Sequence, residues 1–280
     1  MTDRAPHIVT DSTADIPGEV ARRLDIAVVP CQIHFGNQTY REGIDISRQE
    51  FFRRLRQREQ FTTSQPPVGV FAETYRRLLA DGRPIVSIHL ASRLSGVFNS
   101  AWLAANQVDP ERIAVIDGQQ VSMCTGWLAI GAAEAARAGS GVGEVIRQVT
   151  ERLQRLRLFA LIDDLQYLHR GGRVSWASSF LGSLFAIKPI VQVSEGRADL
   201  IEKVRSLARG LDRIASLAAG LGPLERVAVL HADAPDCAAE LVERMSRIFP
   251  REQLLVTEAG TVVSGHAGPG AVGVACLMGG

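Results

Sequence analysis

Short apolar runs alternate with amphipathic helical stretches through the first half of the chain, and this alternation constrains the fold more than any other feature. Each apolar run has the length of one buried strand, and strands joined by helices form βαβ units with parallel strands. The expected strands are 7–10, 26–30, 84–90 and 113–116, and the expected helices begin near Pro17 and cover 47–57, 68–80, 95–106, 122–138 and 142–156. We therefore predict a largely parallel sheet.

The second half of the sequence has a different pattern, in which neighbouring strands can pair as hairpins. The runs 190–193 and 200–204 flank Ser194-Glu195-Gly196-Arg197, which is a hairpin turn signal. Further strands are expected at 158–162, 227–231, 254–258 and 271–277, and helices at 164–168, 176–185, 207–219 and 238–248. This pattern predicts a mixed sheet, and the whole chain is of the α/β class.

A length of 280 residues suits two domains. The change of pattern places the boundary near residue 158, so we expect an N-terminal α/β domain over 1–157 and a C-terminal α/β domain over 158–280. Residues 31–40 alternate and contain Gly36-Asn37, which is a turn signal. A small hairpin insertion near 31–60 is therefore expected within the first domain.

Composition and charge exclude several classes of function. The net charge of +1 gives no broad field for nucleic acid. Four scattered cysteines, at positions 31, 124, 237 and 276, have no zinc-like spacing, so we expect neither a metal nor a cofactor. The start of the sequence has no signal-peptide pattern, and its most apolar helix, near 123–136, is too short for a membrane span. We expect a cytoplasmic protein with reduced thiols.

Three polar clusters could hold an anion. In the first, Ser95 and Gly96 lie between the strand expected at 84–90 and the helix that follows it. In the second, Thr63-Ser64-Gln65-Pro66-Pro67 precedes the helix expected at 68–80, with Ser64 as its expected N-cap. The third cluster, 264–270, is rich in glycine and contains His266. Hydroxyls and free backbone N–H groups at helix starts suit a carboxylate or a phosphate.

Each cluster also has a purely structural interpretation. Ser95 and Thr63 could only cap helices, and the glycines around His266 could only satisfy turns. Gly171-Gly172-Arg173 could be a phosphate loop, but the end of a short helix that begins at Asp164 explains it better. The apolar residues of 176–185 could be core or could line a tunnel for a ligand.

Seven runs in order carry a resemblance to a known family. They are Val9-Thr10-Asp11-Ser12-Thr13, Thr63-Ser64-Gln65-Pro66, Leu94-Ser95-Gly96, Leu168-His169-Arg170-Gly171-Gly172-Arg173-Val174-Ser175, Ile187-Lys188-Pro189, Val204-Arg205-Ser206 and His266-Ala267-Gly268-Pro269-Gly270. The chain thus resembles the DegV family of bacterial fatty-acid-binding proteins over nearly its whole length. The resemblance implies two α/β domains with a long-chain fatty acid in a cleft between them.

The resemblance also implies roles for individual residues. Thr63, Ser95 and His266 would surround the carboxylate, with Ser64 and Gly96 beside them. Some proteins of this family are acyl-binding subunits of a fatty-acid kinase, in which a separate ATP-binding subunit phosphorylates the carboxylate. Arg205 and Arg173 would then lie where that kinase docks.

Two other functions remain open at this point. Ser95, His266 and an aspartate could form a hydrolase triad, but Arg93 stands where a nucleophile elbow has its first glycine. The chain also has no nucleotide-binding glycine loop between a strand and a helix, which is why we expect no catalysis by this chain alone. A lipid chaperone or regulator without a kinase partner is the second alternative.

Overall fold

The computed structural model of the protein describes residues 4–174, 176–177 and 187–280. Most of the expected helix at 176–185 lies outside these residues. The first sheet has four parallel strands in the order β2-β1-β6-β7. They are β2 (Ile26–Val29), β1 (His7–Asp11), β6 (Ile85–His89) and β7 (Ile113–Asp117). The predicted parallel sheet is confirmed.

The second sheet is mixed, as the hairpin pattern predicted. Its six strands are, in order, β10 (Arg197–Val204), β9 (Lys188–Ser194), β8 (Leu156–Leu161), β13 (Val272–Met278), β11 (Leu224–His231) and β12 (Leu255–Glu258). Among the neighbouring strands of this sheet, β11 and β12 pair in parallel, and every other pair is antiparallel. The β9–β10 turn has φ of 51° at Glu195 and 74° at Gly196, the signature of a tight hairpin. The domain boundary near residue 158 stays a prediction.

The expected hairpin insertion is a three-stranded sheet, because Phe61–Ser64 forms a strand that the sequence did not indicate to us. The sheet has the order β4-β3-β5, from β4 (Gln38–Arg41), β3 (Gln32–Phe35) and β5 (Phe61–Ser64), and α2 (Arg48–Arg56) packs on it. We had expected Ser64 to cap a helix. Instead α3 (Val68–Leu79) starts after Pro67, with no side-chain cap. Neighbouring threonines favour the strand, since β-branched side chains fit a pleated surface.

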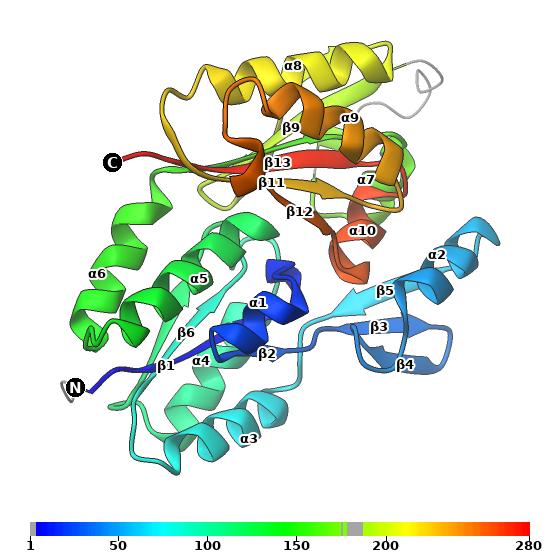
Figure 1. Ribbon diagram of the computed structural model, residues 1–280. Coiled ribbons are helices and arrows are strands. Elements are labelled where there is room, and N and C mark those ends of the chain that lie inside the picture. The colour runs from blue at the N-terminus through cyan, green and yellow to red at the C-terminus, as the bar shows by residue number, and fades with distance from the viewer. Residues whose placement is uncertain (1–3, 175, 178–186) are drawn as a thin grey trace.

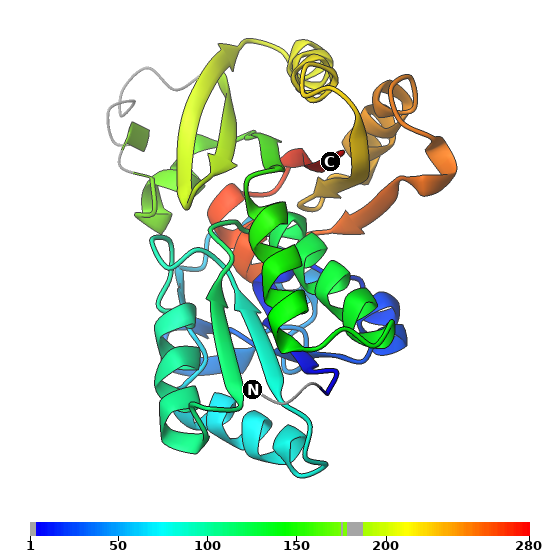
Figure 2. The same cartoon turned by 90° about the vertical axis from the view of Figure 1, so that its left-hand side faces the viewer.

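Helices cover both faces of the parallel sheet (Figures 1 and 2). On one face lie α3 and α4 (Val97–Val108), and on the other lie α1 (Gly18–Arg23), α5 (Met123–Arg137) and α6 (Val142–Leu153). The mixed sheet carries α8 (Leu207–Ala219) and α9 (Pro235–Met245) on its outer face, as Figure 1 shows. The remaining elements are η1 (Ser12–Ala14), α7 (Leu165–Gly171), η4 (Arg251–Gln253) and α10 (Thr261–Ala267).

The helix α5 lies between the two large sheets and is buried nearly all round. It contacts β1 and β6 of the parallel sheet and β13 of the mixed sheet. Its glycines and alanines allow this double contact, because small side chains let backbones approach closely. At Gly126, a Cβ atom would lie 2.7 Å from the carbonyl oxygen of Ala14. Within the described ranges, neither α5 nor any other helix has the length and hydropathy needed to cross a membrane.

Gly126→Ala should therefore lower the free energy of unfolding by about 1–3 kcal/mol, since the methyl group overpacks against fixed backbone. The matched control is Gly143→Ala in the neighbouring helix α6, where a Cβ would meet nothing within 4 Å. That change should leave stability unchanged or raise it by up to about 1 kcal/mol. Urea unfolding followed by circular dichroism measures both. Equal effects of the two changes would contradict close packing at α5.

Candidate functional site

A largely apolar cavity lies where the parallel sheet, the three-stranded sheet and the mixed sheet meet. Its apolar wall comes from β8, β9 and β10, from the loop after β6, and from α7 and α10. The lining residues of this inner cavity are Thr13, Cys31, Thr63, Ser64, Leu90, Leu94, Ser95, Val121, Leu158, Ala160, Ile162, Leu168, Arg173, Val174, Val191, Val193, Ala198, Val262, Val263, His266 and Ala267. Its polar members are Thr13, Thr63, Ser64, Ser95, Arg173 and His266. We call the part of the cavity at Thr63 and His266, where β5 meets α10, its polar end.

Thr63 and His266 meet at this polar end although 203 residues separate them in the chain. Thr63 Oγ1 lies 3.0 Å from His266 Nε2, within hydrogen-bonding distance. Thr63 projects from β5, and His266 lies in the last turn of α10 rather than in the glycine-rich loop we expected. A helix positions the imidazole more firmly than a loop would.

The imidazole of His266 is held in its neutral form. Burial, and then the positive charge of Arg173, lower the pKa of His266 to about 4. The other ring nitrogen, Nδ1, is buried and has no hydrogen-bond partner among the described residues. A Cβ at Gly171 would lie 2.4 Å from it, so the glycine at the end of α7 leaves the space that the ring occupies.

Ser64 and Ser95 reach the same cavity by different routes. Ser64 ends β5, where its Oγ lies 2.8 Å from His34 Nε2 and donates to Gln32 Oε1 at 3.2 Å. Ser95 lies in the turn before α4, with its N–H donating to the Ala91 carbonyl at 3.2 Å. The next residue, Gly96, is the N-cap of α4 and is not among the described residues that line the cavity.

A second, outer cavity adjoins the inner one and shares Thr63, Arg173 and His266 with it. Its wall carries Arg56, Arg58 and Arg170 in addition to Arg173, and also the acids Glu59 and Asp164. Arg173 follows Gly172, which ends α7 with a left-handed φ of 64°, as the helix-end interpretation predicted. The exposed Arg205 follows β10 and lines neither cavity.

The inner wall also includes Thr13, Cys31 and Leu90, which we did not predict from the sequence. Thr13 and Leu90 follow β1 and β6, which are adjacent parallel strands, so their carboxyl ends meet at one edge. That edge is where open α/β sheets bind ligands, and the rule could have indicated both residues. Burial, and then the charge of Asp11, raise the pKa of the Cys31 thiol, so it lines the cavity as a neutral group.

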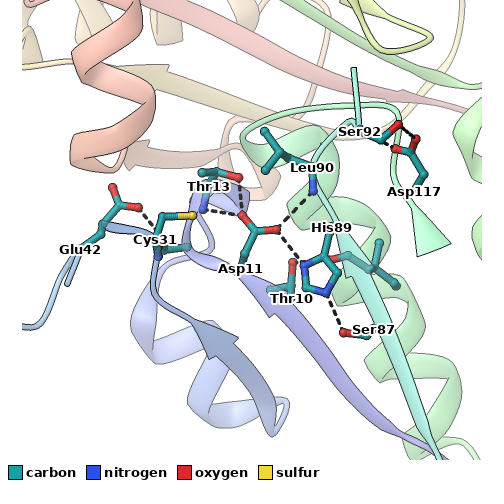
Figure 3. Close-up of polar contacts among 12 residues, drawn as sticks. Thr10, Asp11, Thr13, Cys31, Glu42, Ser87, His89, Leu90, Ser92 and Asp117 are labelled. Atoms are coloured by element: carbon teal, nitrogen blue, oxygen red, sulfur yellow. Dashed lines mark hydrogen bonds and ion pairs between the residues drawn. The ribbon is translucent and has the colours of Figure 1, made fainter. Parts of the chain in front are cut away.

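The buried carboxylate of Asp11 fixes this edge of the sheet (Figure 3). Its Oδ1 accepts hydrogen bonds from the backbone N–H of Thr13 at 3.1 Å and from Thr13 Oγ1 at 2.5 Å. Its Oδ2 accepts from His89 Nδ1 at 2.9 Å and from the N–H of Leu90 at 3.2 Å. Asp11 therefore holds the two loops that follow β1 and β6.

A chain of buried polar groups continues from Asp11 into the parallel sheet. His89 Nε2 lies 2.7 Å from Ser87 Oγ, which lies 2.8 Å from the hydroxyl of Tyr75. When His89 Nδ1 donates to Asp11 and Nε2 accepts, every member is satisfied, because Tyr75 then donates to Ser87 and Ser87 donates to His89. Such satisfied networks fix a single arrangement of the groups they join.

The loop that carries Ser95 has a second attachment. Ser92 Oγ donates to Asp117 Oδ2 at 2.5 Å, and the Ser92 N–H donates to Asp117 Oδ1 at 3.2 Å (Figure 3). Asp117 ends β7. The loop after β6 is therefore bonded to residues at the ends of both neighbouring strands, Asp11 of β1 and Asp117 of β7. Ser95 is thus placed by hydrogen bonds that it does not itself make.

Two further buried carboxylates lie beyond Thr13, at the start of α10. Burial raises the pKa of Asp15 to about 7, against the lowering effect of hydrogen bonds from Ser122 and Gly260. Burial also raises the pKa of Glu42. No group of histidine, cysteine or carboxylate side chains in the described part of the chain has the arrangement of a metal site.

Comparison with known proteins identifies the family. A family model described as uncharacterised proteins of the DegV family matches residues 6–278. The chain belongs to the DegV family. A DegV domain-containing protein of Streptomyces coelicolor is 38% identical over 272 residues, which cover 95% of this chain and 96% of that protein. Protein DegV of Bacillus subtilis is 35% identical over 272 residues, covering 95% and 97%.

Solved DegV structures share the fold. A DegV family protein from Thermus thermophilus, described by its fatty acid binding, has a TM-score of 0.91 at 30% identity and covers 98% of this chain and 99% of its own. DegV from Bacillus subtilis, described as a fatty acid binding protein, has a TM-score of 0.87 at 35% identity with the same coverage. The family and the α/β fold with a parallel and a mixed sheet are confirmed. Both neighbours are described by fatty acid binding, which agrees with our expectation of a binding protein.

The raised pKa of Asp15 predicts a pH dependence of stability in this DegV protein. A carboxyl group with a pKa of 3.8 when unfolded and about 7 when folded stabilises the native state below pH 4, and the contribution is lost as the pH rises to 7. Relative to Asp15→Asn, which stays neutral, the wild type should therefore lose unfolding free energy between pH 4 and 7 and then change no further.

Urea unfolding from pH 4.5 to 8 measures this difference. The control is Asp45→Asn, because the pKa of the exposed Asp45 is lowered to about 2 by Arg41, so its contribution is constant over that range. A difference between wild type and Asp15→Asn that does not vary with pH would show that Asp15 titrates normally.

Proposed function

We propose that this chain binds one long-chain fatty acid in the inner cavity, with the carboxylate at Thr63, Ser95 and His266 and with Ser64 and Gly96 beside it. The observation that carries the proposal is the composition of that cavity, in which apolar side chains form most of the wall and the Thr63 hydroxyl lies against the His266 imidazole. The fatty acid binding described for the Thermus thermophilus and Bacillus subtilis neighbours supports it.

The two parts of the cavity would contribute differently to binding. Each buried methylene of the acyl chain gains about 0.8 kcal/mol, so the apolar wall supplies most of the affinity. The hydroxyls of Thr63 and Ser95 donate to the carboxylate and fix its position. Arg173 supplies the positive charge, because His266 is neutral at physiological pH.

We further propose that the bound fatty acid is presented to a separate ATP-dependent kinase in the cytoplasm, which forms the acyl phosphate. The outer cavity supports this, since it reaches the proposed carboxylate site at Thr63 and His266 and carries four arginines that suit phosphate. The exposed Arg205 would contact the kinase, and Arg173 would lie between the docked kinase and the carboxylate.

The geometry favours this function over a serine hydrolase. In a hydrolase triad, one histidine nitrogen faces the nucleophile and the other bonds a carboxylate. Here His266 Nε2 pairs with Thr63, and Nδ1 faces the space at Gly171 without a hydrogen-bond partner in the described ranges. A lipid chaperone or regulator without a kinase would use the same cavity, and only assays with a partner distinguish it.

Native mass spectrometry of purified protein, followed by lipid extraction, tests the binding. We expect one fatty acid per chain, and we expect Thr63→Ala and Ser95→Ala each to weaken binding by about 1.5–3 kcal/mol, because each removes a hydrogen bond to a charged group. The control is Thr150→Ala, since Thr150 is exposed on α6 and lines neither cavity. No binding of C14–C18 fatty acids by delipidated protein would refute the proposal, and wild-type affinity in both variants would place the carboxylate elsewhere.

The kinase role predicts a separation between binding and turnover. With fatty acid, ATP and a cognate kinase, Arg205→Ala should reduce acyl phosphate formation at least tenfold, while fatty-acid affinity stays within about twofold, as an exposed docking charge acts on the encounter. Arg197→Ala, at the other end of β10, is the control. Acyl phosphate made without any kinase would instead show that this chain is itself an enzyme.

A further inference from the structure

The helix α10 carries His266 but has no N-terminal cap of its own. Its N-cap residue is Gly260, which has no side chain to accept a hydrogen bond from the first turn. Helices usually satisfy these N–H groups with a serine, threonine, asparagine or aspartate at this position. The acceptors for α10 come from distant parts of the chain instead.

Glu42, which follows β4 of the three-stranded sheet, supplies the main cap. Its Oε1 accepts hydrogen bonds from the N–H of Val262 at 2.7 Å and from Thr261 Oγ1 at 3.0 Å. Its Oε2 accepts from Ser12 Oγ at 2.5 Å, and Ser12 Oγ accepts from the N–H of Cys31 at 2.9 Å. Only 6% of Glu42 is exposed, so water does not replace these bonds.

Asp15 completes the cap by accepting from the N–H of Gly260 at 2.8 Å. The absence of a side chain at Gly260 makes room for both carboxylates. A Cβ there would lie 2.6 Å from Glu42 Oε1 and 3.0 Å from Asp15 Oδ1. The glycine is therefore part of the capping arrangement.

The far end of α10 is as closely fitted as its start. His266 lies four residues beyond Val262, which is about 6 Å along the helix axis. Its ring is confined between Thr63 and the space at Gly171, and a Cβ at Gly268 would lie 2.7 Å from the ring of Tyr167. Because α10 has only seven residues, a shift of its first turn would also move His266 in its last turn.

We infer that Glu42 is a positioning residue for His266, which it holds against Thr63 by capping α10 from the three-stranded sheet. That Glu42 matters for fatty-acid binding rests on the proposed function. That Glu42 positions the His266 ring does not depend on it. Glu42 bonds both Ser12, beside the parallel sheet, and α10, so it also sets where the three-stranded sheet sits relative to the polar end of the inner cavity.

The experiment is a pH titration of the His266 ring by NMR in protein labelled with ¹⁵N at its six histidines, with His266→Gln to assign the signal. In the wild type the pKa should be near 4, because the ring is buried beside Arg173. In Glu42→Ala the freed helix should let water reach the ring, and the pKa should rise toward 6.5. Glu42→Gln should keep the wild-type value, because its amide oxygen can still accept from Thr261 and Val262.

Fatty-acid affinity gives a second readout. Glu42→Ala should weaken fatty-acid binding at least tenfold but change the binding of the matching fatty alcohol less than threefold, and Glu42→Gln should restore both. The control is Asp45→Asn, an exposed carboxylate on the same loop. If Glu42→Ala does not fold, Thr261→Val removes one capping bond alone and should shift the His266 pKa in the same direction by a smaller amount.

A folded Glu42→Ala protein with an unchanged His266 titration would overturn the inference, as would a shift of equal size in Glu42→Gln. These results are distinct from failure of the proposed function. If the wild type binds no fatty acid, the proposed function fails, and the ring titration still decides whether Glu42 positions His266.

Discussion

Buried carboxylates at the carboxyl ends of the parallel strands are the interaction on which the site depends. Asp11 satisfies two backbone N–H groups, one hydroxyl and one imidazole, and so fixes the loops after β1 and β6. Burying a carboxylate costs free energy unless hydrogen bonds satisfy both of its oxygens. The loss of any one of these donors would therefore destabilise the folded state. The polar end of the inner cavity therefore depends on Asp11 and His89, which line neither cavity.

The two adjoining cavities divide the chemistry of the molecule. The inner cavity offers apolar surface, and burial of a ligand against it gives affinity without fixing the orientation of the ligand. Its few hydroxyls can fix that orientation. The outer one offers arginines, which attract phosphate and carboxylate groups. Thr63, Arg173 and His266 belong to both walls. A neutral imidazole at that junction adds a hydrogen-bonding group without a second fixed charge.

Periodicity predicted most of the elements, because strands and helices bury faces with different repeats. It failed at β5, where Thr62-Thr63-Ser64 precedes two prolines and has the pattern of a helix start. It also failed at His266, since the glycines at 265, 268 and 270 suggested a loop although α10 runs to Ala267. In both places, packing against another element overrode the local preference: β5 pairs with β3, and α10 packs on α7.

The sequence by itself determined the α/β class, the parallel and mixed sheets and the residue types available for an acidic ligand, because these depend on local pattern and composition. The tertiary structure alone decided which of those residues meet. Thr63 and His266 lie 3.0 Å apart across 203 residues, and Glu42 caps a helix that begins 219 residues later. Such contacts depend on how sheets stack and where helices end. Local propensity carries no information about either, because the energy that fixes them comes from packing between distant segments.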